Sequence, residues 1–425
     1  MKHVIIGNSA AAVGCVEGIR RTNSTDDILL IASEPHHTYS RPLISYLIAG
    51  KTDRQRMKYR PDDFYAANNV TALLGKTAVA IDPAAQTVAL ESGETVAYDT
   101  LLVATGSSPV VFPAEGLEQV QNMRTFTQLQ DAEALLESVG ENTRVLIIGA
   151  GLIGLKCAEG LRSRTANITV VDLAPLVLSS ILKPTPAAII RAHLEANGVG
   201  FRLGTSVAAF RTLPGGGYEA QLQSGETIAF DQLVYAAGVR ANTALVKAAG
   251  GETNRGIVVN TLGQTNLPHV YAAGDCTESP DACTGQHKVM ALLPNAYMQG
   301  EAAGMHMAAG GAPLPCAPEP LIPENAIGFF GKHILSAGIY FDDGAEGKYE
   351  DFDGENYRCF YYDASAQRLM GYILLGRAER AGIYTALIRE ATLLPEAQFQ
   401  QLRREPGLIA FSPEVRAQAL RKQVV

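Results

Sequence analysis

The sequence predicts an α/β fold that contains two similar parallel-sheet units. Two stretches indicate it, because each is a buried-strand run that enters a loop of small residues: VIIGNSAAAVG at 4–14 and VLIIGAGLIGLKCAE at 145–159. A third observation is an internal repeat. Residues 90–106 (LESGETVAYDTLLVATG) and 222–238 (LQSGETIAFDQLVYAAG) are identical at ten of seventeen positions, and one glycine loop precedes each copy. At 425 residues the chain is also too long for one ordinary core.

The second loop has the complete glycine pattern of a Rossmann-type dinucleotide-binding unit. Gly149 predicts a tight turn, Gly151 a close approach to a pyrophosphate, and Gly154 close packing of the following helix on the strand. The next strand, ITVVD, ends at Asp172, which lies 23 residues after Gly149. Because the expected spacing is about 20 residues, this carboxylate is predicted to bind the ribose hydroxyls.

The first loop is a degenerate version of the same pattern. It keeps Gly7, has Ser9 in place of the second glycine and Ala12 in place of the third, and the strand ILLIASE brings Glu34 to the acidic position. A turn of this kind also serves plain core packing, but the repeat favours the interpretation that both loops bind nucleotides.

The two copies of the internal repeat end in a similar way, each downstream of its glycine loop. The repeat ends in Thr105-Gly106 in the first copy and at Gly238 in the second, where backbone is expected to approach a flat ligand. A later stretch, TNLPHVYAAGDCTE, resembles the flavoprotein motif in which a carboxylate bonds the ribityl chain of FAD, and Asp275 is the matching residue. The alternative is that Asp275 caps the next helix. By this resemblance the first loop holds FAD and the second holds a nicotinamide nucleotide.

These motifs, in this order, resemble the FAD-dependent pyridine nucleotide-disulfide oxidoreductase superfamily over almost the whole chain. TYSRPLISYLIAGK at 38–51, residues 292–311 and the stretches AIGFFGKHILSAG and GRAERAGIYTALI look most like its NADH:rubredoxin oxidoreductase and nitrite-reductase-like flavoprotein branch. The resemblance implies an FAD-binding domain at 1–111 and 246–320, an NAD-binding domain at 112–245 and a C-terminal α+β interface domain at 321–425.

The resemblance also implies roles for single residues. Arg41 matches a contact to the FAD phosphates, and Pro294 stands where the backbone approaches the flavin pyrimidine ring. Glu159 resembles the glutamate that orients the nicotinamide amide; the alternative is an exposed charge on a helix. Pro42 occupies the position where relatives carry a redox cysteine, and it is expected to lie beside the cofactor. Thiol chemistry is therefore not expected to be the output.

The six cysteines are scattered, without a CxxC pair or a metal-ligand spacing. Cys276 and Cys283 are the closest pair and are interpreted as ordinary thiols. No metal site is predicted, and the pattern suits a reducing compartment.

Composition narrows the possible partners. Hydrophobic residues make up 47% of the chain, and the net charge of −8 gives no basic field for nucleic acid. No apolar run is long enough for a transmembrane helix, so no membrane partner is expected and the predicted location is cytoplasmic. The first fifteen residues could alternatively be a short signal peptide.

The leading hypothesis is an NADH-dependent flavoprotein reductase that passes electrons through FAD to a one-electron acceptor, rubredoxin or a ferredoxin-type iron-sulfur protein. Alternatives are a cysteine-independent NADH oxidase and a protein that binds FAD and NAD without turnover. A basic patch for the carrier could come from Arg403, Arg404, Arg421 and Lys422, although a solvated helix face explains them equally. The oligomeric state does not follow from the sequence.

Overall fold

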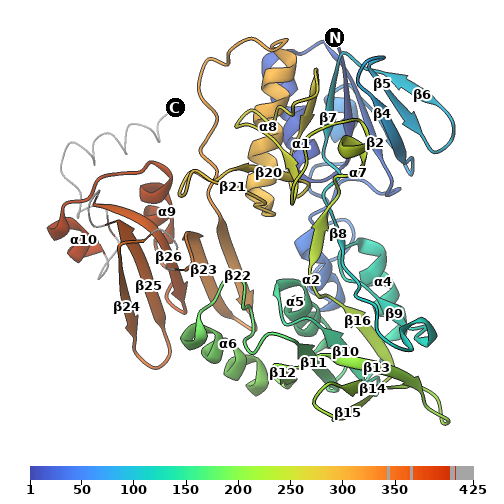
Figure 1. Cartoon of the computed structure of the whole chain (residues 1–425), viewed down its shortest axis with the longest axis vertical. Coiled ribbons are helices and arrows are strands. Elements are labelled where there is room, and N and C mark those ends of the chain that lie inside the picture. Colours follow the sequence, from blue (N-terminus) through green and yellow to red (C-terminus); the bar gives the residue numbers. More distant parts are fainter. Residues whose placement is uncertain (342–344, 364–366, 403–406, 408–425) are drawn as a thin grey trace. The chain divides into compact units, whose positions relative to one another are not determined.

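We describe a computed structural model of the chain, covering residues 1–341, 345–363, 367–402 and 407 (Figure 1). The described chain divides into two compact units. Unit 1 contains Met1–Ser180, Ile190–Pro280 and Gln286–Glu319, and unit 2 contains Ile181–Ile189, Asp281–Gly285 and the chain from Pro320. Helix α6 (Pro184–Ala196) crosses this division.

The first sheet of unit 1 is parallel. Its strands, in spatial order, are β19 (Val270–Ala272), β7 (Thr100–Val103), β1 (Lys2–Ile6), β2 (Asp27–Ala32) and β3 (Val70–Leu74). The central strands are nearly continuous runs of buried apolar residues, since helices or further strands cover both faces. The glycine loop after β1 and the motifs after β7 and β19 therefore meet at one edge of the sheet.

The second sheet of unit 1 repeats this arrangement. Its parallel strands, in spatial order, are β12 (Val199–Leu203), β11 (Ile168–Asp172), β10 (Val145–Ile148), β16 (Gln232–Tyr235) and β9 (Met123–Arg124). The strands β10 and β16 correspond to β1 and β7 of the first sheet. The predicted α/β fold with two Rossmann-like units is confirmed.

The internal repeat forms matching three-stranded antiparallel sheets. One contains β4 (Ala78–Asp82), β5 (Thr87–Leu90) and β6 (Thr95–Ala97), and the other β13 (Val207–Thr212), β14 (Tyr218–Leu222) and β15 (Thr227–Phe230). The predicted Ser-Gly-Glu turns join β5 to β6 and β14 to β15, with Gly93 and Gly225 at φ of +88° and +90°. Two crossing strands, β8 (Ser107–Pro109) and β17 (Val239–Ala241), follow the repeats and pair with each other.

Helix α1 (Ala10–Thr22) packs closely against α8 (Leu293–Ala308), as Figure 1 shows. A Cβ on Gly14 or Gly18 of α1 would overlap a backbone carbonyl oxygen of α8, and the same holds in reverse for Gly300 and Gly304. The second sheet carries α4 (Leu129–Ser138) and α5 (Leu152–Leu161). The short elements of unit 1 are η1 (Arg41–Leu43), α2 (Ile44–Ile48), α3 (Phe64–Ala67), η2 (Leu117–Gln119), α7 (Ala244–Ala248), β18 (Ile257–Val258), β20 (Thr277–Pro280) and β21 (His287–Lys288).

Unit 2 is built on one antiparallel sheet. Its strands, in spatial order, are β22 (Glu324–Phe329), β23 (Lys332–Gly338), β26 (Arg368–Leu375), β25 (Tyr357–Asp363) and β24 (Gly347–Phe352). Helices α9 (Ala381–Arg389) and α10 (Glu396–Leu402) follow, and a core with Phe360 and Tyr384 lies between sheet and helices. This unit has the α+β composition expected for the C-terminal part, while the three predicted domain boundaries stay a prediction.

Within the described ranges no helix is both long and apolar enough to span a membrane.

Candidate functional site

The two glycine turns have the same backbone geometry. Gly7 and Gly149 adopt φ of +131° and +114°. Each donates its N–H to the carbonyl of the penultimate residue of the neighbouring strand, Ile31 and Val171 respectively, at 2.8 Å. A Cβ on Gly7 would overlap the carbonyl oxygen of Ala104, and one on Gly149 that of Ala236. Since Ala104 and Ala236 occupy the same position of the repeat, the repeat and the glycine turns form one recurring unit.

Both helices that follow these turns begin without a side-chain cap. Ser9 precedes α1 and Gly151 precedes α5; neither forms a side-chain cap hydrogen bond, and neither first turn contains an acid. Uncapped N–H groups at a helix start favour an anionic ligand. Gly151 has no atom within 4 Å of an added Cβ, so room lies in front of α5.

The third position of each turn sets how tightly the helix packs. A Cβ on Gly154 would overlap the carbonyl oxygen of Gly149, so only glycine fits there. Ala12, the matching residue in α1, is fully buried and its Cβ is accommodated. The first turn is therefore more open than the second, which explains why its glycine pattern is incomplete.

Asp172 ends β11 beside the second turn. One carboxylate oxygen accepts the N–H of Ala150 at 2.6 Å and the other that of Ala174 at 2.7 Å. Each carboxylate oxygen accepts about two hydrogen bonds, so capacity for ribose hydroxyls remains. No Arg or Lys occurs among the next four residues, Leu173 to Leu176. Asp172 thus also holds the loop itself, a role that the spacing did not reveal.

Glu34 belongs to a cluster of three side chains. It pairs with the Arg41 guanidinium and accepts a hydrogen bond from the Tyr39 hydroxyl at 2.7 Å. Arg41 also donates to the Thr127 carbonyl at 3.1 Å, and its guanidinium lies 5.3 Å from the centre of the Tyr39 ring. The sequence interpretation named Glu34 and Arg41 but missed Tyr39, whose position two residues before Arg41 in TYSRP was the available signal.

Asp275 follows β19 in a turn that helix α8 anchors. Gln299 accepts the N–H of Gly274 at 2.7 Å and the hydroxyl of Thr277 at 3.1 Å. Burial raises the pKa of the Asp275 carboxyl, and the Arg41 guanidinium and the Ser107 hydroxyl offset part of that rise. Holding a partly buried carboxylate is unfavourable for the protein alone, as expected of a group placed for a ligand.

The strand ends of the repeat meet at Asn242. Its side-chain amide donates to the Thr105 carbonyl at 2.9 Å, and its backbone N–H donates to the Gly106 carbonyl at 2.9 Å. The Thr105 hydroxyl donates to the Asn242 carbonyl, also at 2.9 Å. Gly106 and Gly238 have φ of +65° and +115° with no atom within 4 Å of an added Cβ. Backbone at both positions is therefore open, and Asn242 is a second residue that the sequence interpretation missed.

Glu159 lies on α5 where this helix contacts α2. Its side chain is only 12% exposed and pairs with Lys156, whose ammonium lies 5.0 Å from the Tyr46 ring centre. The alternative of an exposed helix charge is therefore wrong. Pro294 lies in the first turn of α8, which also begins without a side-chain cap. Glu159 thus lies on α5, whereas Asp172 ends β11.

Most of the cysteine thiols are buried. Pro42 lies in η1, directly before α2, and all six cysteines are free. Cys15, Cys157, Cys276 and Cys359 are buried, and burial raises the pKa of the Cys276 thiol to about 11. A thiol with so high a pKa is a poor nucleophile at neutral pH. Cys283 is partly exposed and Cys316 exposed.

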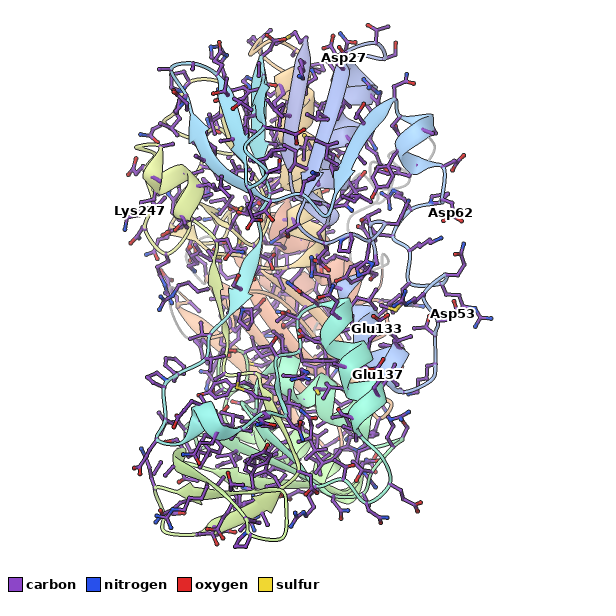
Figure 2. The ribbon with its side chains drawn as sticks, turned by 90° about the vertical axis from the view of Figure 1, so that its right-hand side faces the viewer. Asp27, Asp53, Asp62, Glu133, Glu137 and Lys247 are labelled. Atoms are coloured by element: carbon purple, nitrogen blue, oxygen red, sulfur yellow. The ribbon has the colours of Figure 1, made fainter. Side chains whose placement is uncertain are left out.

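Several of the acidic side chains labelled in Figure 2 form ion pairs. The labelled acids Asp53, Asp62 and Glu133 pair with Arg56, Lys58 and Arg54 respectively. The basic patch considered in the sequence analysis, Arg403, Arg404, Arg421 and Lys422, lies outside the described residues.

Residues 1–300 match the family of pyridine nucleotide-disulphide oxidoreductases. The chain belongs to this family. It is 31% identical over 337 residues to the epsilon subunit of NADH-dependent phenylglyoxylate dehydrogenase from Aromatoleum evansii, covering 79% of each chain. It is 29% identical over 319 residues to rubredoxin-NAD(+) reductase from Pseudomonas putida, covering 75% of this chain and 83% of the relative.

A solved structure and two longer relatives complete the comparison. The water-forming NADH oxidase of Lactobacillus brevis superposes with a TM-score of 0.85 at 20% identity, over 100% of this chain and 99% of that one, and this likeness bears on the fold alone. The chain spans about half the length of two Bacillus subtilis relatives, the assimilatory nitrate reductase electron transfer subunit (47%) and nitrite reductase (49%).

The chain is thus an NAD(P)H-dependent oxidoreductase whose cofactors are FAD and NAD(H). The residues present fit these groups. Two positive-φ glycine turns lead into helix starts without side-chain caps, a carboxylate lies at or just after the end of the next strand of each sheet, and a third carboxylate, Asp275, is partly buried.

Proposed function

We propose that this chain passes electrons from NADH through FAD to a small one-electron carrier protein of rubredoxin or ferredoxin type. The observation that carries the proposal is the combination of two dinucleotide turns with Pro42 at the redox-thiol position and four buried cysteines. Without a thiol relay, the flavin is the last carrier within the chain. The similarity to a protein named rubredoxin-NAD(+) reductase supports the same acceptor class.

The first sheet of unit 1 is assigned to FAD. The turn at Gly7, Ser9 and Ala12 would take the pyrophosphate, and Glu34 the adenosine ribose. Arg41 supplies a positive charge for the phosphates, and Asp275 a carboxylate for the ribityl hydroxyls. Open backbone at Thr105-Gly106, together with Pro42 and the α8 start at Pro294, would line the flavin ring.

The second sheet is assigned to NADH. The turn at Gly149, Gly151 and Gly154 would take the pyrophosphate, Asp172 the ribose, and Gly238 open backbone beside the nicotinamide half. When bound, the nicotinamide supplies a hydride, and the flavin accepts the pair and can release electrons singly. Glu159, held by Lys156, would accept a hydrogen bond from the nicotinamide amide and so orient the ring. The location we propose is the cytoplasm, which suits six free cysteines.

Anaerobic stopped-flow kinetics test the acceptor. The FAD-loaded protein is reduced with NADH and mixed with rubredoxin or a ferredoxin at several salt concentrations. Fast, salt-sensitive reoxidation is expected, because small carriers dock through charge. Reoxidation only after oxygen is admitted would replace the proposal by an NADH oxidase. A flavin that NADH leaves oxidised would indicate a protein that binds both cofactors without turnover.

A further inference from the structure

Three residues of the described chain take up the full hydrogen-bonding capacity of the Tyr39 hydroxyl. It donates to Glu34 at 2.7 Å, and it accepts the Arg41 Nη1 hydrogen at 3.2 Å and the Leu129 N–H at 3.0 Å. A hydroxyl has one donor and two acceptor sites, so all three are occupied. Tyr39 is 9% exposed, which keeps water from substituting for it.

Of these three contacts, the one with Leu129 reaches helix α4 on the second sheet. Leu129 is the first residue of α4, and its N–H is one of the groups that a helix start leaves without an intrahelical partner. The Arg41 contact to the Thr127 carbonyl runs in parallel. The start of α4 is therefore held by the same side chains that hold Glu34.

The other capping contacts at the start of α4 come from within the same segment. Asp131 accepts the N–H groups of Thr127 at 2.8 Å and Gln128 at 3.0 Å, which completes a capping box. At the other end, Arg164 donates to the carbonyls of Leu136 and Val139, at 2.8 and 3.0 Å. Arg164 lies just after α5, the helix of the NAD turn. Helix α4 thus links the Glu34 cluster to the NAD half.

We propose that Tyr39 is a positioning residue that couples FAD binding at Glu34 to the ordering of the α4 start. A ribose that hydrogen-bonds Glu34 fixes this carboxylate, which fixes the Tyr39 hydroxyl and so the Leu129 N–H. Such coupling is reciprocal, because an ordered α4 start must raise FAD affinity by the same factor. The inference rests on the proposed role of Glu34 as an FAD ligand.

Two variants separate the two ends of this link. Tyr39→Phe keeps the ring and removes all three hydrogen bonds. Leu129→Pro removes the Leu129 N–H and shortens a buried side chain, but leaves Tyr39 and its bond to Glu34 in place. It lies at a first helical position, where proline is favoured. Gln128 before it has φ −125° and ψ 161°, which a following proline allows. Tyr271→Phe is the matched control, since its buried hydroxyl contacts His306 at 2.8 Å and neither Glu34 nor α4.

The test is hydrogen exchange of peptides from residues 125–138, with and without FAD, together with the FAD dissociation constant. In the wild type and Tyr271→Phe, FAD should slow exchange at the α4 start. Tyr39→Phe should lose this slowing and bind FAD about tenfold more weakly, which is about 1.4 kcal/mol. Leu129→Pro should lose the slowing at the neighbouring amides and bind FAD within about threefold of wild type.

Contrary outcomes are distinct. Full FAD-dependent protection in Tyr39→Phe, or none in the wild type, would overturn the coupling. If Tyr39→Phe does not fold, Leu129→Pro decides in the same way, and retained protection there overturns the coupling too. A wild-type chain that fails to bind FAD would instead refute the proposed function.

Discussion

At the scale of single residues, several positions have a geometry that is typical of ligand-binding sites. Gly7 and Gly149 have left-handed backbones against a neighbouring carbonyl, and Asp275 keeps a partly buried charge. Such positions cost stability in the free protein and are typical of binding sites.

The second glycine turn can be tested by substitution. Gly149→Ala should lower the free energy of unfolding by about 1–3 kcal/mol, because the new Cβ overlaps the Ala236 carbonyl. FAD content should stay normal while NADH-driven flavin reduction slows by about a hundredfold or more. Gly204→Ala is the control, since Gly204 has φ +72° but no atom within 4 Å of an added Cβ. A normal rate of flavin reduction in Gly149→Ala would show that this turn does not bind NADH.

Asp275 should show opposite effects on stability and binding. Its folded pKa is raised, so the stability it contributes is present at low pH and is lost as pH rises through the folded pKa. Asp275→Asn should therefore raise the melting temperature of the FAD-free protein at pH 7 and flatten its pH dependence. FAD affinity should fall by about ten- to a hundredfold, as for loss of a charged hydrogen-bond partner. Unchanged FAD affinity would contradict the assigned role.

Asp172 should set the choice of nucleotide. NADH should be preferred over NADPH, because the carboxylate repels a 2′-phosphate and Leu173 to Leu176 offer no positive charge. Asp172→Ala should lower the ratio of kcat/KM for NADH to kcat/KM for NADPH. It should also raise KM for NADH by about tenfold, because two loop N–H groups lose their acceptor. A wild-type enzyme that prefers NADPH would refute this.

At the scale of elements, the contact of α1 with α8 fixes the start of α1 beside the Gly7 turn, which we assign to FAD. Gly300→Ala should force the helices apart, since its Cβ overlaps the Ala11 carbonyl, and lower stability by about 1–3 kcal/mol. FAD should bind more weakly as well. Gly382→Ala in α9 is the control, because nothing lies within 4 Å of its added Cβ. There the higher helix propensity of alanine should stabilise by about 0.5–1 kcal/mol. Equal effects of both changes would show that helix contact is not the cause.

The sequence was informative where a pattern is local. Glycine loops, the spacing to Asp172 and the repeat predicted both sheets and their turns, because backbone geometry requires those residues at fixed intervals. Tyr39, Asn242 and Gln299 were not predicted. Their contacts with Leu129, Thr105 and Gly274 span 90, 137 and 25 residues, so no local spacing signals these contacts. Glu159 was left between two interpretations, since exposure depends on the packing of α5 against α2.

At the scale of the whole molecule, we propose a reductase that uses two cofactors and no redox-active thiol. Both halves of unit 1 use one design, a glycine turn against a repeat carbonyl, for two nucleotides. We therefore expect electrons to pass through one redox centre within the chain, the flavin. A disulfide reductase of similar fold would have a second redox centre, a pair of cysteines that stores another two electrons.

Anaerobic titration of the FAD-loaded protein with NADH tests this claim most directly. Flavin absorbance should be bleached completely by about one NADH per FAD, because no thiol pair takes up further electrons. A variant with all six cysteines changed to serine should give the same end point if it folds and retains FAD. A requirement for about two NADH per FAD in the wild type, reduced to one in that variant, would contradict the account by revealing a redox-active disulfide.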